Sequence, residues 1–344
     1  MKIIFSTYLP ISLISGGPRV QVLQTAKELN KLNVTVKFFD QWAKNDFMKV
    51  DLVHLFAANI GTYHLAKILH QQKIPFVISP IVYSQRSNSL IRTATNLTYL
   101  IKKIKPGFYT DFQITKDICD WSKIVLPNTS DEFDLINNGL SIDKMKLILI
   151  PNGVENKFLR GSNTLFKKKF NLNNFLLNVG HIGPERKNVY RLINSLKGTN
   201  HKLVIIGKIS KDSSGDKCLQ IANENPNILL IDGINHDSPL LSSAYSSCSA
   251  FVLPSLFETP GIAALEAGLA GAPIVITEKG GTKDYFQNFA QYVNPYSKQS
   301  ILNGIENSLR EKKSDSLQKH IRNNFLWSSV AEKTLQAYKQ ALKY

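Results

Sequence analysis

Short, continuous apolar runs alternate with longer amphipathic segments along the whole sequence of 344 residues. Such runs are typical of strands buried on both faces, and the segments between them are typical of helices that connect parallel strands. In the first half we expect strands at 2–6, 35–40, 51–56, 76–79, 123–127 and 147–150. In the second half we expect them at 175–180, 202–207, 228–232, 250–253, 272–277 and 290–293. The pattern predicts two α/β domains, each a doubly wound parallel sheet with helices on both faces.

A break in this alternation covers residues 151–174, which include the turn-forming pair Asn152-Gly153. We therefore expect an N-terminal Rossmann-like domain over residues 1–155 and a C-terminal one over residues 156–325. In open parallel sheets, ligands bind at the carboxyl ends of the strands. The turns that lead from a strand into a helix are thus where we expect the chemistry.

Composition restricts the class of protein further. A hydrophobic fraction of 43% and a charged fraction of 20% are typical of a folded chain, and no stretch approaches the ~18 apolar residues that cross a bilayer. The three cysteines match no metal or redox motif, which favours a reduced, cytoplasmic location. The net charge of +16 favours an anionic partner such as a membrane surface, a nucleic acid or a phosphate-bearing substrate. A lysine-rich composition alone explains the charge as well.

The first strand-to-helix turn follows an apolar start that Ser6, Thr7 and Pro10 interrupt, so we expect a strand and a loop there and not a signal peptide. The loop ends in Gly16 and Gly17, just before a helix. Glycines let the backbone approach a ligand closely, and the start of a helix attracts anions. This turn suits a phosphate or the reacting sugar, although glycines in loops are more often simple turn formers.

The second candidate turn, residues 179–188, follows the first strand of the second half. It places Lys187 at the start of a helix, where the helix dipole disfavours a cation unless an anion is bound nearby. An exposed loop lysine explains the same residue equally well. His181, in this turn, can donate to a phosphate or can be a structural histidine.

The third turn, within residues 251–273, is the most informative. A buried strand ends, a loop carries Glu258, and Pro260 and Gly261 open a helix that carries Glu266. The two glutamates would lie about 12 Å apart if the whole span were helical, so both can line one wall of a site. Surface glutamates are the alternative, but the alanines and glycines of this helix indicate close packing, where stray carboxylates are unexpected.

These residues suit a nucleotide diphosphate sugar. The pyrophosphate would lie on the helix start, Glu266 would accept hydrogen bonds from the ribose hydroxyls, and Glu258 would face the sugar. The sequence has no D-x-D, HExxH or clustered His and Cys set, so we expect no metal. The helix dipole, backbone N–H groups and Lys187 would then stabilise the anionic leaving group.

The whole chain resembles the retaining glycosyltransferases of family 4, which have the GT-B fold. Glu258 and Glu266 have the spacing of that family's E-x7-E motif, within the segment PSLFETPGIAALEAGLAGAPIV. Gly16-Gly17, the segment LILIPNGVENKF, Lys187 and the segment FLWSSVAEKTLQAYKQ also match. The resemblance implies two Rossmann-like domains that face a central cleft, with residues 326–344 crossing back to the N-terminal domain as a helix.

The resemblance also implies roles for individual residues. Glu258 would be the catalytic residue and contact the donor sugar, Glu266 would bind the ribose, and Lys187 would hold the pyrophosphate. The other implied donor-binding residues are Gly16, Gly17, His181, Thr259, Pro260, Gly261 and Ile262. The donor would be a UDP-, GDP- or dTDP-sugar, transfer would retain the anomeric configuration, and no metal would be required.

Two positions depart from the family pattern. His181 stands where members often have an arginine, and Ile81 lies in a segment where many members have a histidine near the sugar and the acceptor. His54 ends a neighbouring strand and is a candidate to replace that missing histidine. A histidine packed in the core is the simpler interpretation.

Family members usually dock the acceptor on the N-terminal domain, where residues 83–120 of this chain are unusual. The segment contains Arg86, Arg92, Lys102, Lys103 and Lys105, with no acid before Asp111. A basic amphipathic helix can lie on an anionic membrane. We therefore hypothesise peripheral contact with the inner face of the cytoplasmic membrane and a glycan or lipid-linked acceptor, in cell-surface polysaccharide or lipopolysaccharide synthesis. An ordinary helix packed on its own domain fits the segment equally well.

Three other classes of protein share some of these features. A GT-B-fold nucleotide-sugar epimerase has the same architecture but needs no acceptor. A decayed sugar-nucleotide-binding protein fits the altered His181 and Ile81 positions, but not the intact glutamate pair. A nucleic-acid-binding protein is suggested by charge alone, and the sequence contains no motif that reads nucleic acid. A glycosyltransferase without a nucleic acid partner fits best.

Overall fold

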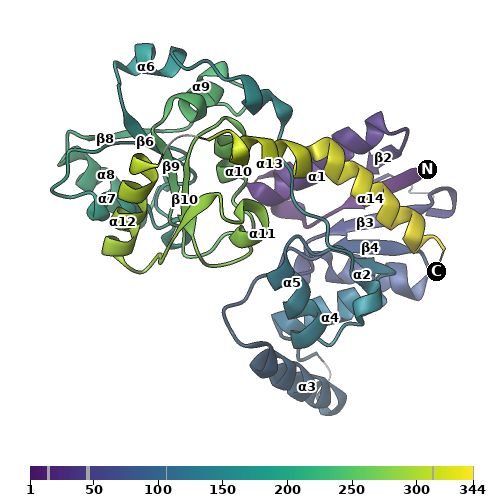
Figure 1. Cartoon of the computed structure of the whole chain (residues 1–344). Coiled ribbons are helices and arrows are strands. Elements are labelled where there is room, and N and C mark those ends of the chain that lie inside the picture. Colours follow the sequence, from purple (N-terminus) through teal and green to yellow (C-terminus); the bar gives the residue numbers. More distant parts are fainter. Residues whose placement is uncertain (14–15, 44–46, 106, 312–313, 344) are drawn as a thin grey trace. The chain divides into compact units, whose positions relative to one another are not determined.

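The chain forms two compact units, each with its own parallel sheet (Figure 1). The computed structural model describes residues 1–13, 16–43, 47–105, 107–311 and 314–343. The first unit contains Met1–Gly153 and Trp327–Tyr344, and the second contains Val154–Leu326. Both units are Rossmann-like α/β structures, so the predicted fold class is confirmed.

The sheet of the first unit has the strand order β2-β1-β3-β4-β5, and its paired strands are parallel. Its strands are β1 (Lys2–Ser6), β2 (Thr35–Phe38), β3 (Leu52–Phe56), β4 (Phe76–Ser79) and β5 (Ile124–Val125). Its α-helices are α1 (Gly17–Lys31), α2 (Ile60–Gln71), α3 (Asn88–Ile104), α4 (Asp111–Trp121), α5 (Ser130–Asp134) and α14 (Trp327–Ala341). The strand expected at 147–150 is wrong: the segment makes an isolated bridge between Leu147 and Val125, because β5 is too short to support a longer ladder.

Each face of this sheet has its own core, because successive strand residues point to opposite faces. On one face, Ile3 and Phe5 of β1 pack with residues of α1 and α14. On the other face, Ile4 and Val53 pack with residues of α2 and α4. Helix α14, which is distant in sequence, thus completes a core of the first unit through Trp327 and Tyr338.

The sheet of the second unit has the strand order β11-β10-β9-β6-β7-β8, and its paired strands are also parallel. Its strands are β6 (Phe175–Val179), β7 (Lys202–Ile206), β8 (Ile228–Ile231), β9 (Ala250–Leu253), β10 (Ile274–Thr277) and β11 (Ala290–Val293). Its α-helices are α6 (Leu165–Phe170), α7 (Val189–Ser195), α8 (Ser213–Asn223), α9 (Pro239–Ser247), α10 (Ile262–Leu269), α11 (Thr282–Phe286), α12 (Lys298–Arg310) and α13 (Ser316–Asn324).

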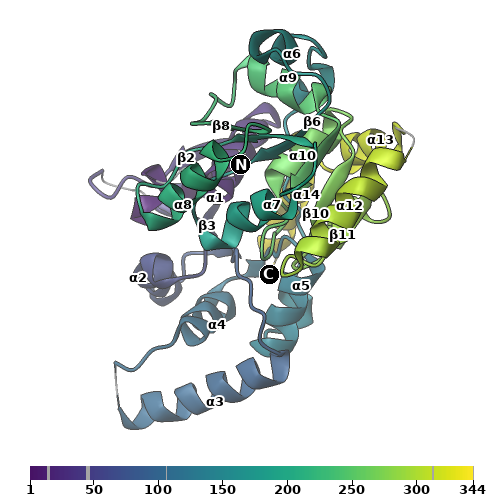
Figure 2. The same cartoon turned by 90° about the vertical axis from the view of Figure 1, so that its left-hand side faces the viewer.

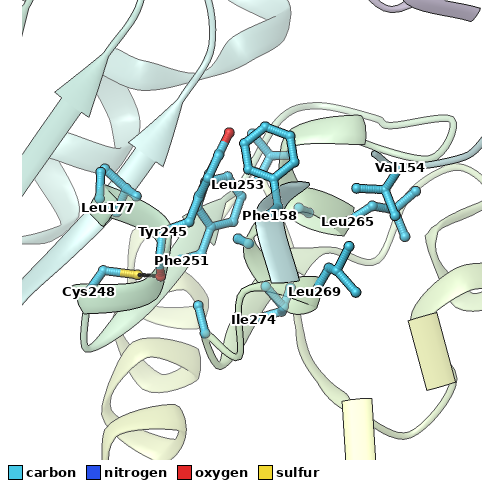
Figure 3. Packing of buried hydrophobic residues seen from close by; sticks show 14 of the residues in the cluster. Val154, Phe158, Leu177, Tyr245, Cys248, Phe251, Leu253, Leu265, Leu269 and Ile274 are labelled. Atoms are coloured by element: carbon cyan, nitrogen blue, oxygen red, sulfur yellow. Dashed lines mark hydrogen bonds between the residues drawn. The ribbon is translucent and has the colours of Figure 1, made fainter. Parts of the chain in front are cut away.

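Helix α10 is held in place by close packing on two sides. Leu265 and Leu269 pack in the core that also contains Phe251 of β9 and Tyr245 of α9 (Figure 3). On another side, a Cβ atom at Gly268 would lie 2.5 Å from the end of the Ile321 side chain of α13, so a larger residue there would force that side chain to shift. The start of α10 is therefore a fixed position at the edge of the sheet.

Candidate active site

Two strand-to-helix turns meet in the second unit. They follow β6 and β9, which are parallel neighbours with Leu177 opposite Phe251, so both turns lie at the same edge of the sheet. The backbone N–H of Leu256 donates to the carbonyl of Arg186 at 2.8 Å, and this hydrogen bond joins the two turns. Sheet order thus brings together loops that are distant in sequence.

This meeting places Lys187 against Glu258. The Lys187 Nζ atom lies 2.7 Å from Glu258 Oε1, although the residues are 71 positions apart in sequence. Arg186 Nη1 lies 3.4 Å from the same oxygen. Burial alone would raise the pKa of Glu258, but the two cations outweigh that effect and hold the pKa below its ordinary value. Glu258 is therefore a buried carboxylate that stays ionised at neutral pH.

The loop after β10 fixes the backbone of Glu258. The Glu258 N–H donates to the carbonyl of Lys279 at 3.2 Å. Gly280 has a positive φ of 85°, and a Cβ atom there would lie 2.2 Å from the Glu258 carbonyl oxygen. A glycine is thus required beside the loop that carries Glu258.

The turn after β6 is electropositive. The pKa of the half-buried His181 is lowered by burial and further by the nearby cations Lys187, Arg186 and Lys208. An added positive charge is unfavourable there, and an anion is correspondingly favoured. The surroundings of His181 therefore suit a phosphate.

Helix α10 begins beside the paired Lys187 and Glu258. Gly261 precedes it with a positive φ of 84°, and a Cβ atom at Gly261 would lie 3.0 Å from Leu253. Pro260 is buried, whereas Thr259 and Ile262 are partly exposed. The first N–H groups of a helix have no acceptor within the helix and attract anions. The start of α10 therefore offers a second attraction for a phosphate.

Glu266, in α10, is buried and accepts hydrogen bonds on both of its oxygens. Its Oε1 lies 2.7 Å from His236 Nε2, and its Oε2 accepts from the Tyr245 hydroxyl at 2.7 Å. Sequence reasoning missed both partners, because a histidine after β8 and a tyrosine in α9 carry no motif. Their contact with Glu266 follows from the packing of α9 and the β8–α9 loop against α10.

The residues next to His236 form a charged cluster. Lys157 Nζ lies 2.6 Å from Asp237 Oδ1, 2.9 Å from Glu155 Oε2 and 3.0 Å from His236 Nδ1. Potential metal ligands of Glu155, His236 and Asp237 lie within 4.8 Å of one another. The ammonium group of Lys157 already contacts all three residues, so it supplies the positive charge that a metal ion would bring to this cluster.

Three of the predicted residues, Gly16, Gly17 and His54, lie in the first unit, and their surroundings differ. Gly16 is the residue before α1 and Gly17 is its first residue, and both are exposed. His54 is 1% exposed, with Nδ1 2.6 Å from the Tyr338 hydroxyl and Nε2 3.0 Å from Ser79 Oγ. Burial lowers the pKa of His54 to about 3, so it is neutral. The structure therefore corrects the expectation that His54 is an acceptor-side group. His54 is a hydrogen-bonded histidine of the core.

The basic residues of α3 also differ in their surroundings. The Arg92 guanidinium donates to the carbonyl of Asn138 through Nε at 2.8 Å and Nη2 at 2.6 Å. Lys105 is exposed at the end of the helix. The side chains of Lys102 and Lys103 lie outside the described part of the structure. Arg92 thus anchors α3 to the segment after α5.

Comparison with known proteins relates the chain to glycosyltransferases. Residues 162–325 match the family model described as glycosyl transferases group 1. An uncharacterized glycosyltransferase from Methanocaldococcus jannaschii is 30% identical over 156 residues, 43% of this chain and 39% of that protein. The capsular polysaccharide biosynthesis glycosyltransferase CapM from Staphylococcus aureus is 28% identical over 208 residues, 56% of this chain and 54% of CapM. The matching stretches thus span about half or less of these relatives.

Solved structures of similar fold cover the whole chain. Sucrose-phosphate synthase from Thermosynechococcus elongatus superposes with a TM-score of 0.78 at 16% identity, over 100% of both chains. HepE from Anabaena, solved with UDP and glucose, superposes with a TM-score of 0.72 at 14% identity, over 99% of this chain and 100% of that one. The fold is therefore that of the GT-B glycosyltransferases, and the second unit carries the sequence similarity to group 1.

Proposed function

We propose that this chain is a retaining glycosyltransferase of family 4 that moves a sugar from a nucleotide diphosphate sugar to a glycan or lipid-linked acceptor. The observation that carries the proposal is the contact of Lys187 with Glu258 beside the start of α10, the helix that also carries Glu266. The match of the second unit to group 1 glycosyltransferases supports it. The similarity to a capsular polysaccharide enzyme supports a place in cell-surface polysaccharide synthesis.

The second unit binds the donor in this proposal. The diphosphate lies at the start of α10, near Gly261 and Ile262, and contacts Lys187. An ammonium group has three N–H donors, so Lys187 can bind a phosphate oxygen without releasing Glu258. Glu266 accepts hydrogen bonds from the ribose hydroxyls, since each carboxylate oxygen can accept more than one hydrogen bond. Thr259, Pro260 and His181 line the diphosphate and sugar positions.

The reaction replaces one bond to the anomeric carbon with another. The bond to the diphosphate oxygen breaks, and a bond to the acceptor oxygen forms on the same face of the sugar. In this proposal the leaving diphosphate oxygen takes the proton of the acceptor hydroxyl, and His54, which is buried in the core, takes no part. Lys187, the α10 dipole and backbone N–H groups stabilise the leaving diphosphate, so the proposed reaction requires no metal.

A donor screen tests the proposal. The purified chain should be stabilised against heat by one of UDP-, GDP- or dTDP-sugar, because a ligand that binds the folded state raises apparent stability. Glu266→Ala should weaken that binding by about 10-fold or more, because hydrogen bonds to a charged group are lost. Product analysis with and without a glycan acceptor separates transfer from epimerisation, which needs no acceptor. Binding of no nucleotide sugar, or unchanged binding in Glu266→Ala, would contradict the proposal.

The proposed acceptor side includes peripheral contact with an anionic membrane through α3. Four exposed apolar residues lie on one side of α3: Leu90, Leu97, Leu100 and Ile104, with exposed fractions of 55%, 57%, 56% and 87%. The buried side carries Ile91, Thr95 and Thr98. The two threonine hydroxyls donate to backbone carbonyls of their own helix at 2.8 Å. Helix α3 thus buries one isoleucine and two threonines and exposes four apolar side chains on another side.

The location and charge of α3 support a lipid surface as the partner. The helix lies at the outer edge of the first unit in two perpendicular views (Figure 1, Figure 2). It contains no acidic residue, and Lys105 follows it. Apolar side chains with flanking cations are typical of helices that lie in an anionic membrane interface. Among the described residues, no helix is both long and apolar enough to span a bilayer.

Vesicle sedimentation tests this contact. We expect the chain to sediment with vesicles that contain phosphatidylglycerol and less with vesicles of phosphatidylcholine alone. The double variant Leu97→Gln, Leu100→Gln should bind about 10-fold more weakly or worse, because the burial of two leucines is lost. Ile68→Gln is the matched control, since Ile68 is 47% exposed on another helix of the same unit. Equal sedimentation of the double variant and the wild type would contradict the contact.

A further inference from the structure

Glu266 is held by a chain of hydrogen bonds that continues beyond its two direct partners. His236 Nε2 lies 2.7 Å from Glu266 Oε1, and His236 Nδ1 lies 3.0 Å from Lys157 Nζ. Glu155 Oε2 lies 3.4 Å from the same Nδ1 atom. Both nitrogens of the imidazole thus have partners, and one of these partners is the proposed ribose-binding carboxylate.

The chemistry of these partners fixes which nitrogen of His236 carries a proton. An ammonium group only donates hydrogen bonds, and an ionised carboxylate only accepts them. In neutral His236, Lys157 therefore donates to Nδ1, and the proton lies on Nε2, where it is donated to Glu266. In protonated His236, Nδ1 also carries a proton, for which Glu155 Oε2 at 3.4 Å is the acceptor, and Nε2 still donates to Glu266.

We propose that His236 is a positioning residue that orients Glu266 for the ribose of the donor in both protonation states of the imidazole, with Lys157 selecting the required tautomer of the neutral form. The inference rests on the proposed function, because it assigns Glu266 to the ribose. It adds His236 and Lys157 to the donor site, although neither belongs to the E-x7-E motif.

The surroundings of His236 support this role. Phe158 packs edge-on against His236, with 5.3 Å between ring centroids, and against Tyr245, with 5.5 Å. One ring thus contacts both hydrogen-bond partners of Glu266. Figure 3 shows Phe158 next to Tyr245 among the buried residues of the core. The hydrogen bond to Glu266 raises the pKa of His236 above its ordinary value, even though burial and Lys157 oppose this. The charged groups that face the imidazole are Glu266, Glu155, Asp237 and Lys157.

Two amide variants of His236 test the inference by calorimetric titration with UDP, GDP and dTDP. His236→Gln keeps an N–H donor near the Nε2 position, whereas the shorter His236→Asn cannot reach Glu266. We expect His236→Asn to weaken binding of the nucleotide by about 10-fold and His236→Gln to stay within about 2-fold of the wild type. Because His236 is partly exposed, we expect thermal unfolding to show that both variants fold.

A double-mutant cycle separates positioning from direct contact. In the Glu266→Ala background, His236→Asn should change the affinity by less than about 2-fold, because its effect passes through Glu266. The 2′,3′-dideoxy form of the bound nucleotide should likewise be insensitive to His236→Asn. An undiminished effect in either experiment would show that His236 contacts the nucleotide itself and would overturn the inference.

A pH comparison tests the tautomer assignment. Lys157→Met removes the donor to Nδ1, so the proton of neutral His236 can move to Nδ1. Nε2 then has no hydrogen to donate to Glu266. We expect the affinity ratio of wild type to Lys157→Met to be near one at about pH 5.5, where His236 is protonated, and to rise by about 3-fold or more at about pH 8.5. A ratio that does not change with pH would exclude this role of Lys157.

The outcomes distinguish this inference from the proposed function. Binding of none of the three nucleotides by the wild type would count against the proposed function itself. Weaker binding by Glu266→Ala together with full affinity in His236→Asn would leave the proposed function standing and overturn the role of His236.

Discussion

Replacing Glu258 with alanine should lower the rate of sugar transfer by about 1,000-fold while changing nucleotide affinity by less than about 3-fold. The anomeric carbon gains positive charge as its bond to the diphosphate breaks. Glu258 is a buried carboxylate whose lowered pKa keeps it ionised, and its charge would stabilise that state in surroundings with little water. In the proposed function the diphosphate and the ribose are bound by other groups, so we expect the nucleotide affinity to be spared. Steady-state transfer assays and titration with the nucleoside diphosphate measure the two quantities.

Two further variants identify the origin of the loss. Glu258→Gln keeps the shape of the side chain and removes its charge, so it should lose nearly as much activity as alanine. Glu185→Ala is the matched control, since Glu185 is an exposed glutamate in the same turn as Lys187, and we expect its activity to be unchanged. Full transfer activity in Glu258→Ala would refute the catalytic assignment.

Replacing Lys187 with methionine should weaken binding of the nucleoside diphosphate by about 10- to 100-fold, because a charged hydrogen bond to the diphosphate is lost. The same change should lower the free energy of unfolding at neutral pH by about 3 kcal/mol, because removing one partner leaves Glu258 buried beside a more distant cation. Titration calorimetry and thermal unfolding give the two values. Lys187→Arg, which keeps the charge, should retain most of the stability.

The stability effect of Lys187→Met should depend on pH in a defined direction. In the wild type, folding lowers the pKa of Glu258 below its ordinary value of 4.5, so the ionised Glu258 stabilises the folded state at pH values above 4.5. This stabilisation is lost as the pH falls through the lower pKa of the folded state. Without Lys187, burial dominates and favours the protonated form of Glu258, so the variant loses stability as the pH rises. The difference in Tm between wild type and variant should therefore be larger at about pH 7 than at about pH 4. A constant difference would show that Lys187 does not set the ionisation of Glu258.

Much of the fold could be predicted because its strands are continuous apolar runs between helices. Strands such as Phe76–Ser79 and Ala250–Leu253 have the expected bounds, since both faces of the sheet are covered and every strand residue is apolar or small. Helix α4, Asp111–Trp121, was not predicted, because Lys116, Asp117 and Asp120 interrupt its apolar pattern. Its buried residues, including Ile114 and Ile118, become recognisable as a face only against the sheet.

The candidate site could be predicted only one loop at a time. The turn with Lys187 and the turn with Glu258 were each found from local chemistry, but their contact depends on β6 lying next to β9. Local sequence does not state the order of strands in a sheet. For the same reason, the bonds from His236 and Tyr245 to Glu266 had no signal in the sequence. The outward apolar side of α3 was obscured because exposed Leu90 and buried Ile91 are adjacent in sequence and only about 100° apart around the helix.

The position of α14 in the first unit has a consequence for synthesis on the ribosome. The second unit is one uninterrupted stretch, Val154–Leu326, so all of it is translated before α14 begins. The first unit cannot close the core around Ile3 and Phe5 until Trp327 and Tyr338 emerge. The usual order of domain folding, with the N-terminal domain first, is therefore reversed: the second unit can be complete while the nascent N-terminal sheet still exposes one apolar face.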